Sequence, residues 1–432
     1  MVPAPASPPS PARLRAARAG LTAVFFVNGV LFGTWASRVP AVKEQVGAGN
    51  GVLGLTLLGI ALGALLAKQL AGQLVTRTGT VPVTRAGAAL SCLLLLPPAF
   101  VDGAAGLGIA LLLFGAGMGL LDLGMNAHGV ELERLRGRPV MSSLHASFSA
   151  GGLVGALAGG LAAAHGLGPR AHFALVTVVL GALAALATTR LLPSPARPAR
   201  AQAVPRTWVR VPRRLRFPLT LLAFTGLCAA AGEGAAADWS ALYLHGELGR
   251  STGFASLGYA LFSVAMAVGR LAGDGLTARW GALRTVVWAA APAGTVFALA
   301  LASGDATLAL IGYTVLGLGL SVVVPVVFST AGTLGGTAFG PSLTYVSSIN
   351  GIGMLMGPPL IGFVAEAIGL RPALGLVSVL AVLSAVLMTA FAGRAAPQAA
   401  GLAAPAHDHA TKDAHPEEDV MNGDSDARHP TH

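Results

Sequence analysis

Twelve apolar runs, each about 20 residues long and nearly free of charge, constrain this chain more than any other feature. An apolar helix of that length matches the hydrocarbon thickness of a bilayer. Charged residues make up 11% of the 432 residues, whereas soluble domains carry about 25%. We therefore predict an all-α polytopic membrane protein with twelve transmembrane helices. The predicted spans lie near 20–39, 52–73, 82–101, 106–130, 139–164, 171–192, 217–243, 252–273, 284–302, 306–330, 341–364 and 372–393.

The net charge of +10 is distributed in a way that indicates membrane topology. A nucleic-acid partner is not expected, because the basic residues lie between apolar runs without interleaved aromatic residues. Segments on one side hold most of the arginines, which by the positive-inside rule places that side in the cytoplasm. We therefore predict a multi-pass protein of the cell (plasma) membrane, the inner membrane of a bacterium, with both termini cytoplasmic. The few basic residues on the outer side are Arg38, Lys43, Arg170, Arg250 and Arg371.

Composition divides the chain into five segments. Residues 1–19 are rich in Pro and Ala, and we predict a disordered N-terminal segment. A signal peptide is an alternative for this region, but the similar runs that follow favour a first span. The Pro- and Arg-rich stretch 193–216 predicts a cytoplasmic linker between two six-helix bundles, 20–192 and 217–393. The tail 394–432 is predicted to be disordered, and its histidines are too sparse to indicate a metal site.

The two halves repeat without gaps. Gly51–Gly79 aligns with Gly253–Gly281, and Gly155 aligns more weakly with Gly357. Two six-helix halves related by an axis along the membrane normal are typical of transporters. The strongest matches in the alignment are Lys68 with Arg270, Leu74 with Leu276, Arg77 with Arg279 and Gly79 with Gly281.

A family resemblance lies in the same repeat. Gly72, Leu74, Arg77 and Gly79 resemble the G-x-L-x-D-R-x-G loop between the second and third helices of major facilitator superfamily transporters. Thr76 stands where that family has Asp, so the charge relay of the loop is in doubt although the turn is not. The resemblance covers the membrane region and implies alternating access. The expected conformational loop residues are Gly72, Leu74, Arg77, Gly79, Leu276, Arg279 and Gly281.

A finer resemblance points to the MosC-like branch of that superfamily, which is similar to a rhizopine carrier. It rests on the segment that holds Asp122, Asn126 and His145, together with Glu233 and the Asp238–Trp239 pair. The resemblance implies transport of a small polar solute, such as a polyol or a sugar derivative.

Polar side chains inside the spans are the candidates for a substrate and proton pathway. Asp122 and Asn126 lie four residues apart and therefore share a helix face. A carboxylate in hydrocarbon is a functional hypothesis by default, with a structural hydrogen bond as the alternative. Glu233 lies mid-span among small residues and is a second possible proton carrier. The full expected set is Asn28, Asp122, Asn126, His145, Ser149, Glu233, Tyr345 and Asn350, of which Asn28 and His145 have helix-linking or capping roles as alternatives.

An outer gate is predicted where the first and seventh spans end. We expect Arg38 and Asp238 to approach each other when the protein is open to the cytoplasm, with Trp35 and Trp239 beside them. The alternative for both tryptophans is the aromatic belt at the membrane surface. Lys68 and Arg270 are expected to extend toward the inner surface by snorkelling.

We favour a proton-coupled importer of a small polar solute, working as a monomer in the lipid bilayer. An exporter of drugs or metabolites is the alternative within transport. A membrane enzyme is disfavoured because the sequence has no HExxH, GxSxG or CxxC motif, and a non-transporting sensor because no soluble domain is evident. Cys92 and Cys228 both fall in apolar runs, so we expect no disulfide framework, no metal site and no cofactor.

Overall fold

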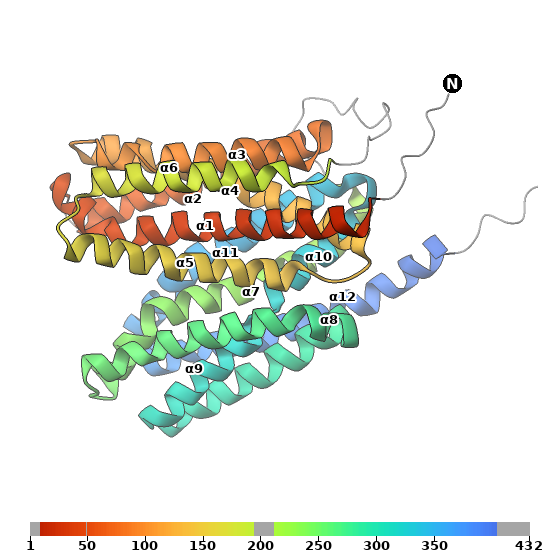
Figure 1. The fold of residues 1–432 in the computed structure, drawn as a ribbon. Coiled ribbons are helices and arrows are strands. Elements are labelled where there is room, and N and C mark those ends of the chain that lie inside the picture. The colour runs from red at the N-terminus through yellow and green to blue at the C-terminus, as the bar shows by residue number, and fades with distance from the viewer. Residues whose placement is uncertain (1–8, 49, 194–210, 404–432) are drawn as a thin grey trace, which may run out of the picture. The chain divides into compact units, whose positions relative to one another are not determined.

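The computed structural model describes residues 9–48, 50–193 and 211–403, and the α-helix is the dominant element of this part of the chain. No β-strand occurs among the described residues. Short helical turns lie between long helices, at Pro97–Ala99 (η1), Tyr243–Glu247 (η3) and Gly336–Ala338 (η4). The long helices (Figure 1) are α1 Pro11–Gln45, α2 Asn50–Thr78, α3 Thr80–Leu94, α4 Ala104–Arg136, α5 Met141–Ala164, α6 Pro169–Thr189, α7 Arg213–Leu242, α8 Thr252–Ser303, α9 Ala306–Leu320, α10 Val323–Gly335, α11 Phe339–Ile368 and α12 Leu370–Ala403.

Eleven helical segments of the described residues are long and apolar enough to cross a membrane, which confirms the all-α polytopic class. The twelve predicted spans differ from this number because two of them, 252–273 and 284–302, both lie within α8. A straight helix of 52 residues would be about 78 Å long, more than twice the hydrocarbon thickness. The chain breaks at Gly281, where φ is 78° and ψ is 164°. Figure 1 shows α8 as two arms joined at this sharp bend.

The predicted repeat is visible in the backbone. Gly79, between α2 and α3, has φ 87° and ψ 175°, close to the values at Gly281. Residues other than glycine rarely adopt these backbone angles, which explains why glycine occupies both turns. We call the end of the helices at which Gly79 and Gly281 lie the glycine-turn end.

Close helix packing repeats in the same way. A Cβ atom on Gly151 or Gly155 of α5 would lie within 2.3 Å of backbone oxygens of α1. At the equivalent positions of α11, a Cβ on Gly353 or Gly357 would lie 2.4 Å from backbone oxygens of α7. Small residues therefore bring α1 onto α5 and α7 onto α11. The halves meet where α2 contacts α11 and α5 contacts α8.

Three segment boundaries require correction. Residues 11–19, predicted to be disordered, form the start of α1, because Ser10 caps the helix and Pro11 suits its first turn. The expected linker 193–216 is shorter, since α7 begins at Arg213. The Ala-rich residues 394–403, predicted to be disordered, continue α12 as helix. Residues 194–210 and 404–432, with the tail histidines, lie outside the described residues. Among the described residues, those up to Ala392 form one compact unit, and the end of α12 from Gly393 onward belongs to a separate one.

Candidate transport site

An ion pair between α2 and α4 lies at the centre of the candidate site. Lys68 Nζ is 2.9 Å from Asp122 Oδ2, and the two side chains are 12% and 28% exposed. The expectation that Lys68 snorkels to the inner surface is therefore wrong. A partner carboxylate on the neighbouring helix neutralises the ammonium group and makes the longer reach to water unnecessary.

A second ion pair joins α8 to α7. Arg270 Nη2 is 3.3 Å from Glu233 Oε2, and the side chains are 7% and 25% exposed. Snorkelling is wrong for Arg270 for the same reason. Lys68 and Arg270 align in the repeat, so equivalent positions supply the cation of each pair. That alignment was the sequence signal for a shared role. In both pairs the carboxylate is the more exposed partner.

Asp122, Asn126 and His145 lie together, the first two on one face of α4 as their spacing predicts, and His145 on α5. The Asn126 amide donates to Asp122 Oδ1 at 3.0 Å, which leaves its oxygen as an acceptor. That oxygen lies 3.1 Å from His145 Nε2, so the hydrogen bond requires the imidazole proton on Nε2. Asp122 Oδ2 also accepts from Ser347 Oγ of α11 at 3.0 Å. The carboxylate therefore contacts both halves.

Ser149 links the two ion pairs through α5. Its hydroxyl donates to the His145 carbonyl at 3.2 Å and accepts a hydrogen bond from the Arg270 guanidinium. We call the set Lys68, Asp122, Asn126, His145, Ser149, Glu233, Arg270 and Ser347 the polar network. It holds five of the eight residues predicted for the pathway.

The other three predicted pathway residues lie outside the polar network. Asn28 is 4% exposed, and its Oδ1 is a buried acceptor without a hydrogen-bond partner among the described residues. Asn350 Oδ1 is likewise a buried acceptor without a hydrogen-bond partner among the described residues, and it lies beside Gly226 of α7. Tyr345 instead lies with its hydroxyl 2.9 Å from Thr220 Oγ1. Two buried amide oxygens are thus able to accept from a hydroxyl-bearing solute.

Residues of the predicted outer gate lie at the opposite end from the glycine turns. Arg38 is 3% exposed and donates to the carbonyls of Gly159 and Leu167, both in its own half. Asp238 is exposed. Trp35 is buried against Phe114 and Phe173 rather than placed in an aromatic belt. Trp239 is half-buried on α7, next to Gly362 of α11.

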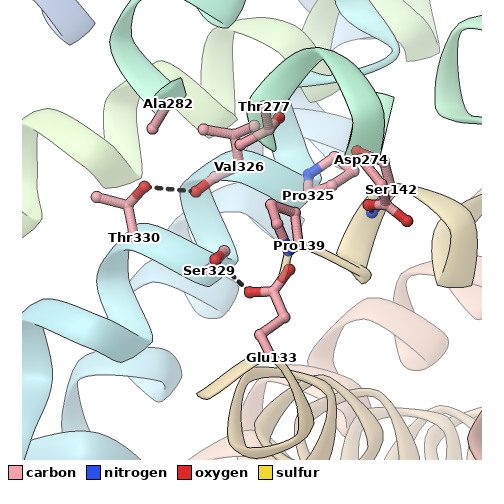
Figure 2. Close-up of a pocket in the computed structure, with 10 residues that line it drawn as sticks. All are labelled: Glu133, Pro139, Ser142, Asp274, Thr277, Ala282, Pro325, Val326, Ser329 and Thr330. Carbon is pink, nitrogen blue, oxygen red and sulfur yellow. Dashed lines mark hydrogen bonds between the residues drawn. The ribbon is translucent and has the colours of Figure 1, made fainter. Parts of the chain in front are cut away.

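Sequence reasoning missed the seam between α5 and α8. Asp274 of α8 accepts from the backbone amides of Ser142 at 2.9 Å and Ser143 at 3.1 Å, at the start of α5. A small cavity of about 20 Å3 lies at this seam (Figure 2). Four of the residues that line it belong to α5 and α8: Ser142, Asp274, Thr277 and Ala282. A carboxylate at a helix N-terminus is stabilised by the exposed amides and the helix dipole. The available signal was the repeat, which aligns Asp274 with Gly72 of the expected conformational loop.

Glu133 is a second carboxylate at the start of α5. Its Oε1 accepts from the amides of Val140 at 2.7 Å and Met141 at 3.0 Å. The Ser329 hydroxyl of α10 donates to the other oxygen, as Figure 2 shows. Glu133 therefore joins the two halves at the glycine-turn end.

The seam between α2 and α11 is equivalent in position, and among the described residues no carboxylate binds the start of α11 as Asp274 binds the start of α5. A Cβ on Gly72 would lie 1.9 Å from Thr344 Oγ1, and one on Gly340 would lie 2.5 Å from the Gly72 oxygen. Thr76, which replaces the Asp of the family pattern, donates to the Gly72 carbonyl at 2.9 Å. Every cross-half hydrogen bond described above lies in the part of the helices nearer the glycine turns.

Comparisons with known proteins identify the family of the chain. The sequence profile of the Major Facilitator Superfamily matches residues 21–340. An uncharacterized MFS-type transporter of Yersinia pestis is 35% identical over 82% of this chain and 91% of its own length. An uncharacterized transporter, y4wD, of Sinorhizobium fredii is 36% identical over 85% and 96%. The membrane protein MosC of Rhizobium meliloti is 31% identical over 81% and 84%, which confirms the predicted resemblance to that branch.

Solved structures share the fold. FucP in its outward conformation has a TM-score of 0.73 at 17% identity, over 87% of this chain and 98% of that one. The human organic anion transporter MFSD10 has a TM-score of 0.70 at 16% identity, over 88% and 100%. At these identities the likeness concerns the fold alone.

Proposed function

Since the chain belongs to the major facilitator superfamily and is therefore a secondary transporter, we propose that it couples a small polar solute to protons. The fold does not determine which substrate is transported, because solved structures of this fold include a fucose:proton symporter and an organic anion transporter. The proposal therefore depends on the site. Asp122 and Glu233 are the proposed proton carriers, and the amides of Asn28 and Asn350 are proposed to bind solute hydroxyls.

The observation that carries the proposal is the polar network, which joins both ion pairs and both halves. The two carboxylates are a quarter or more exposed, so a proton can reach them from open space. Asp122 also accepts from Ser347 across the halves. Protonation removes the charge that holds Lys68 and weakens the cross-half contact, which biases the equilibrium between the two access states.

Accumulation and exchange in proteoliposomes test this role. Asp122→Asn or Glu233→Gln is expected to abolish proton-driven accumulation of a labelled solute, found first with a panel of polyols, sugars and amines. Exchange of solute across the membrane is expected to continue, since it needs no net proton movement. Asp102→Asn is the control, because Asp102 is an exposed carboxylate outside the spans. Full accumulation in both site variants would refute the assignment.

The alternative is an exporter that exchanges solute for protons. It uses the same carboxylates and differs only in the direction of net flux. We favour an importer, and a proton gradient of each orientation in oriented vesicles distinguishes the two. Export driven by inward proton flow would establish the alternative.

The predicted orientation and the outer gate belong to the same proposal. Both termini and residues 193–216 are proposed to be cytoplasmic, so a single cysteine at Ala199 should resist an impermeant thiol reagent in intact cells. The Arg38–Asp238 pair is proposed for the state that is closed at the opposite end. Cross-linking of cysteines at these two positions only in the presence of solute and protons would support it, and cross-linking in every condition would argue against a gate.

A further inference from the structure

A groove of about 760 Å3 lies beside the first turns of α1, where this helix meets α5 and the end of α4. Arg15, Arg18 and Arg136 form one part of its lining. Ala19, Ala23 and Phe26 are in the other part and follow Arg15 along one face of α1, at helical spacings of three and four residues. We call this feature the arginine groove. Its lining changes from basic to apolar over about 12 Å of helix, between Arg18 and Phe26.

The charge of the arginine groove is offset only in part, because Asp274 attracts Arg136 while Arg18 and Arg138 repel it. Arg18 donates to the Ser143 hydroxyl at 3.1 Å, a neutral partner. Arg136 Nη1 is buried and has no hydrogen-bond partner among the described residues. None of the three arginines forms an ion pair with a carboxylate of the described residues. Guanidinium groups keep their charge in proteins, so an anion from outside the chain is needed to offset their repulsion.

We propose that the arginine groove binds one anionic phospholipid. The phosphate lies between Arg15, Arg18 and Arg136, where guanidinium groups match its oxygens in bidentate geometry. An acyl chain runs along Ala19 and Ala23 toward Phe26, in the direction of the membrane interior. A free phosphate ion satisfies the arginines but leaves the apolar part of the groove exposed to water, so the lipid fits both parts of the lining.

The site adjoins the seam between the halves. Arg18 donates to the Ser143 hydroxyl, and the Ser143 amide donates to Asp274 of the other half. A lipid held by Arg18 therefore stabilises the start of α5, which in this conformation is hydrogen-bonded to Asp274 of α8.

The test uses the full-length protein in a neutral detergent, with native mass spectrometry and thermal unfolding as readouts. Dimyristoyl phosphatidylglycerol is the anionic probe, dimyristoyl phosphatidylcholine the uncharged control and inorganic phosphate the headgroup control. We expect one phosphatidylglycerol per chain, bound saturably and about tenfold or more tighter than phosphatidylcholine. Inorganic phosphate at the same concentration should raise the unfolding temperature little or not at all.

Variants separate the two parts of the groove. The double variant Arg15→Gln/Arg136→Gln should weaken phosphatidylglycerol binding by about tenfold or more. Arg13→Gln removes the same kind of charge from an exposed position of α1 outside the groove and should change the affinity less than about twofold. Ala23→Trp fills the apolar part and should weaken lipid binding although every arginine remains. Arg15→Gln alone, at an exposed position, serves if the double variant is unstable.

Three results would overturn the proposal. Equal stabilisation by inorganic phosphate would show a free-anion site. Equal binding of phosphatidylcholine, or binding that does not saturate, would show that the headgroup charge is not recognised. An effect of Arg13→Gln as large as that of the groove variants would show general surface attraction.

Discussion

The two seams that join the halves at the glycine-turn end occupy equivalent places in the repeat but are built differently. At the α5–α8 seam, Asp274 binds two backbone amides at the start of α5, and Arg270 reaches Ser149. At the α2–α11 seam, Gly72 stands at the position equivalent to Asp274 and fits closely against Thr344, while side-chain hydrogen bonds from Lys68 and Gln69 reach α11 further along the helix. The comparison teaches that equivalent positions of the two seams make the contact between the halves differently, through a carboxylate at Asp274 and through close packing at Gly72.

The family pattern explains what changed. Thr76 occupies the place at which the resembled loop carries an Asp, so the α2–α11 seam lacks that carboxylate. The carboxylate contact lies instead on the equivalent helix of the other half, four residues toward the N-terminal side of Ala278, the position equivalent to Thr76. The account therefore assigns the charge-sensitive contact to Asp274 and the steric contact to Gly72.

The largest effect is expected from Gly72→Val. Its Cβ would lie 1.9 Å from Thr344 Oγ1, and such overpacking costs about 1–3 kcal/mol. The state closed at the glycine-turn end should lose population by about tenfold or more. Spin labels at the exposed positions Arg138 and Thr333, one in each half, report the separation as a longer distance. Gly275→Val is the control, because a Cβ on Gly275 meets no atom within 4 Å. An equal effect of both changes would contradict the steric assignment.

A moderate effect is expected from Asp274→Asn. The change removes the charge at the start of α5 and one of the two accepting oxygens, since Oδ1 and Oδ2 each bind one amide, a loss of about 1–2 kcal/mol. The same spin-label pair should report a longer distance in the variant than in the wild-type protein. High salt should make this difference smaller, because it screens the Asp274 charge in the wild-type protein. Asp305→Asn is the control, since Asp305 also binds two backbone amides at a helix start, through one oxygen and inside one half. It should alter stability without altering the distance, and a shift as large as that of Asp274→Asn would remove Asp274 from its assigned role.

The smallest effect is expected from Thr76→Asp, which restores the family residue. The Thr76 hydroxyl lies near Gly340 in the first turn of α11, so a carboxylate there is stabilised by the helix N-terminus. The closed state should gain about 0.3–1 kcal/mol, seen as a narrower distribution at the shorter distance. Thr78→Asp, at an exposed position two residues on, is the control. No difference between these two variants would show that the seam cannot use a charge.

The sequence predicts the architecture well because its signals are local. Span length, the arginine bias and the aligned glycines are readable without tertiary structure, and the similar backbone angles at Gly79 and Gly281 agree with the alignment of the two glycines. The contact of Asp122 with Asn126 also follows, because four residues make one helical turn. The loop expected between 273 and 284 does not exist, since one glycine makes the turn within α8.

Pairings between helices could not be predicted, because they depend on which faces meet. From the sequence, Lys68 and Arg270 are expected to extend toward the membrane surface. In the structure each of them forms an ion pair with a carboxylate on another helix. Asp274 gave no signal beyond its alignment with Gly72, and the structure places it at the start of α5. Trp35 has an outer-end position in the sequence that suits an aromatic belt, yet neighbouring rings bury it.

The central claim is that protons on Asp122 and Glu233 control how the halves meet. The most direct test measures the spin-label distance between positions 138 and 333 as the pH falls, in the wild-type protein and in Asp122→Asn/Glu233→Gln. Protonation removes both carboxylate charges and weakens the polar network, so the wild-type distance should lengthen at lower pH. The double variant, already without these charges, should show the longer distance at every pH. A wild-type distance that does not change with pH, or a double variant that keeps the full pH response, would contradict the account.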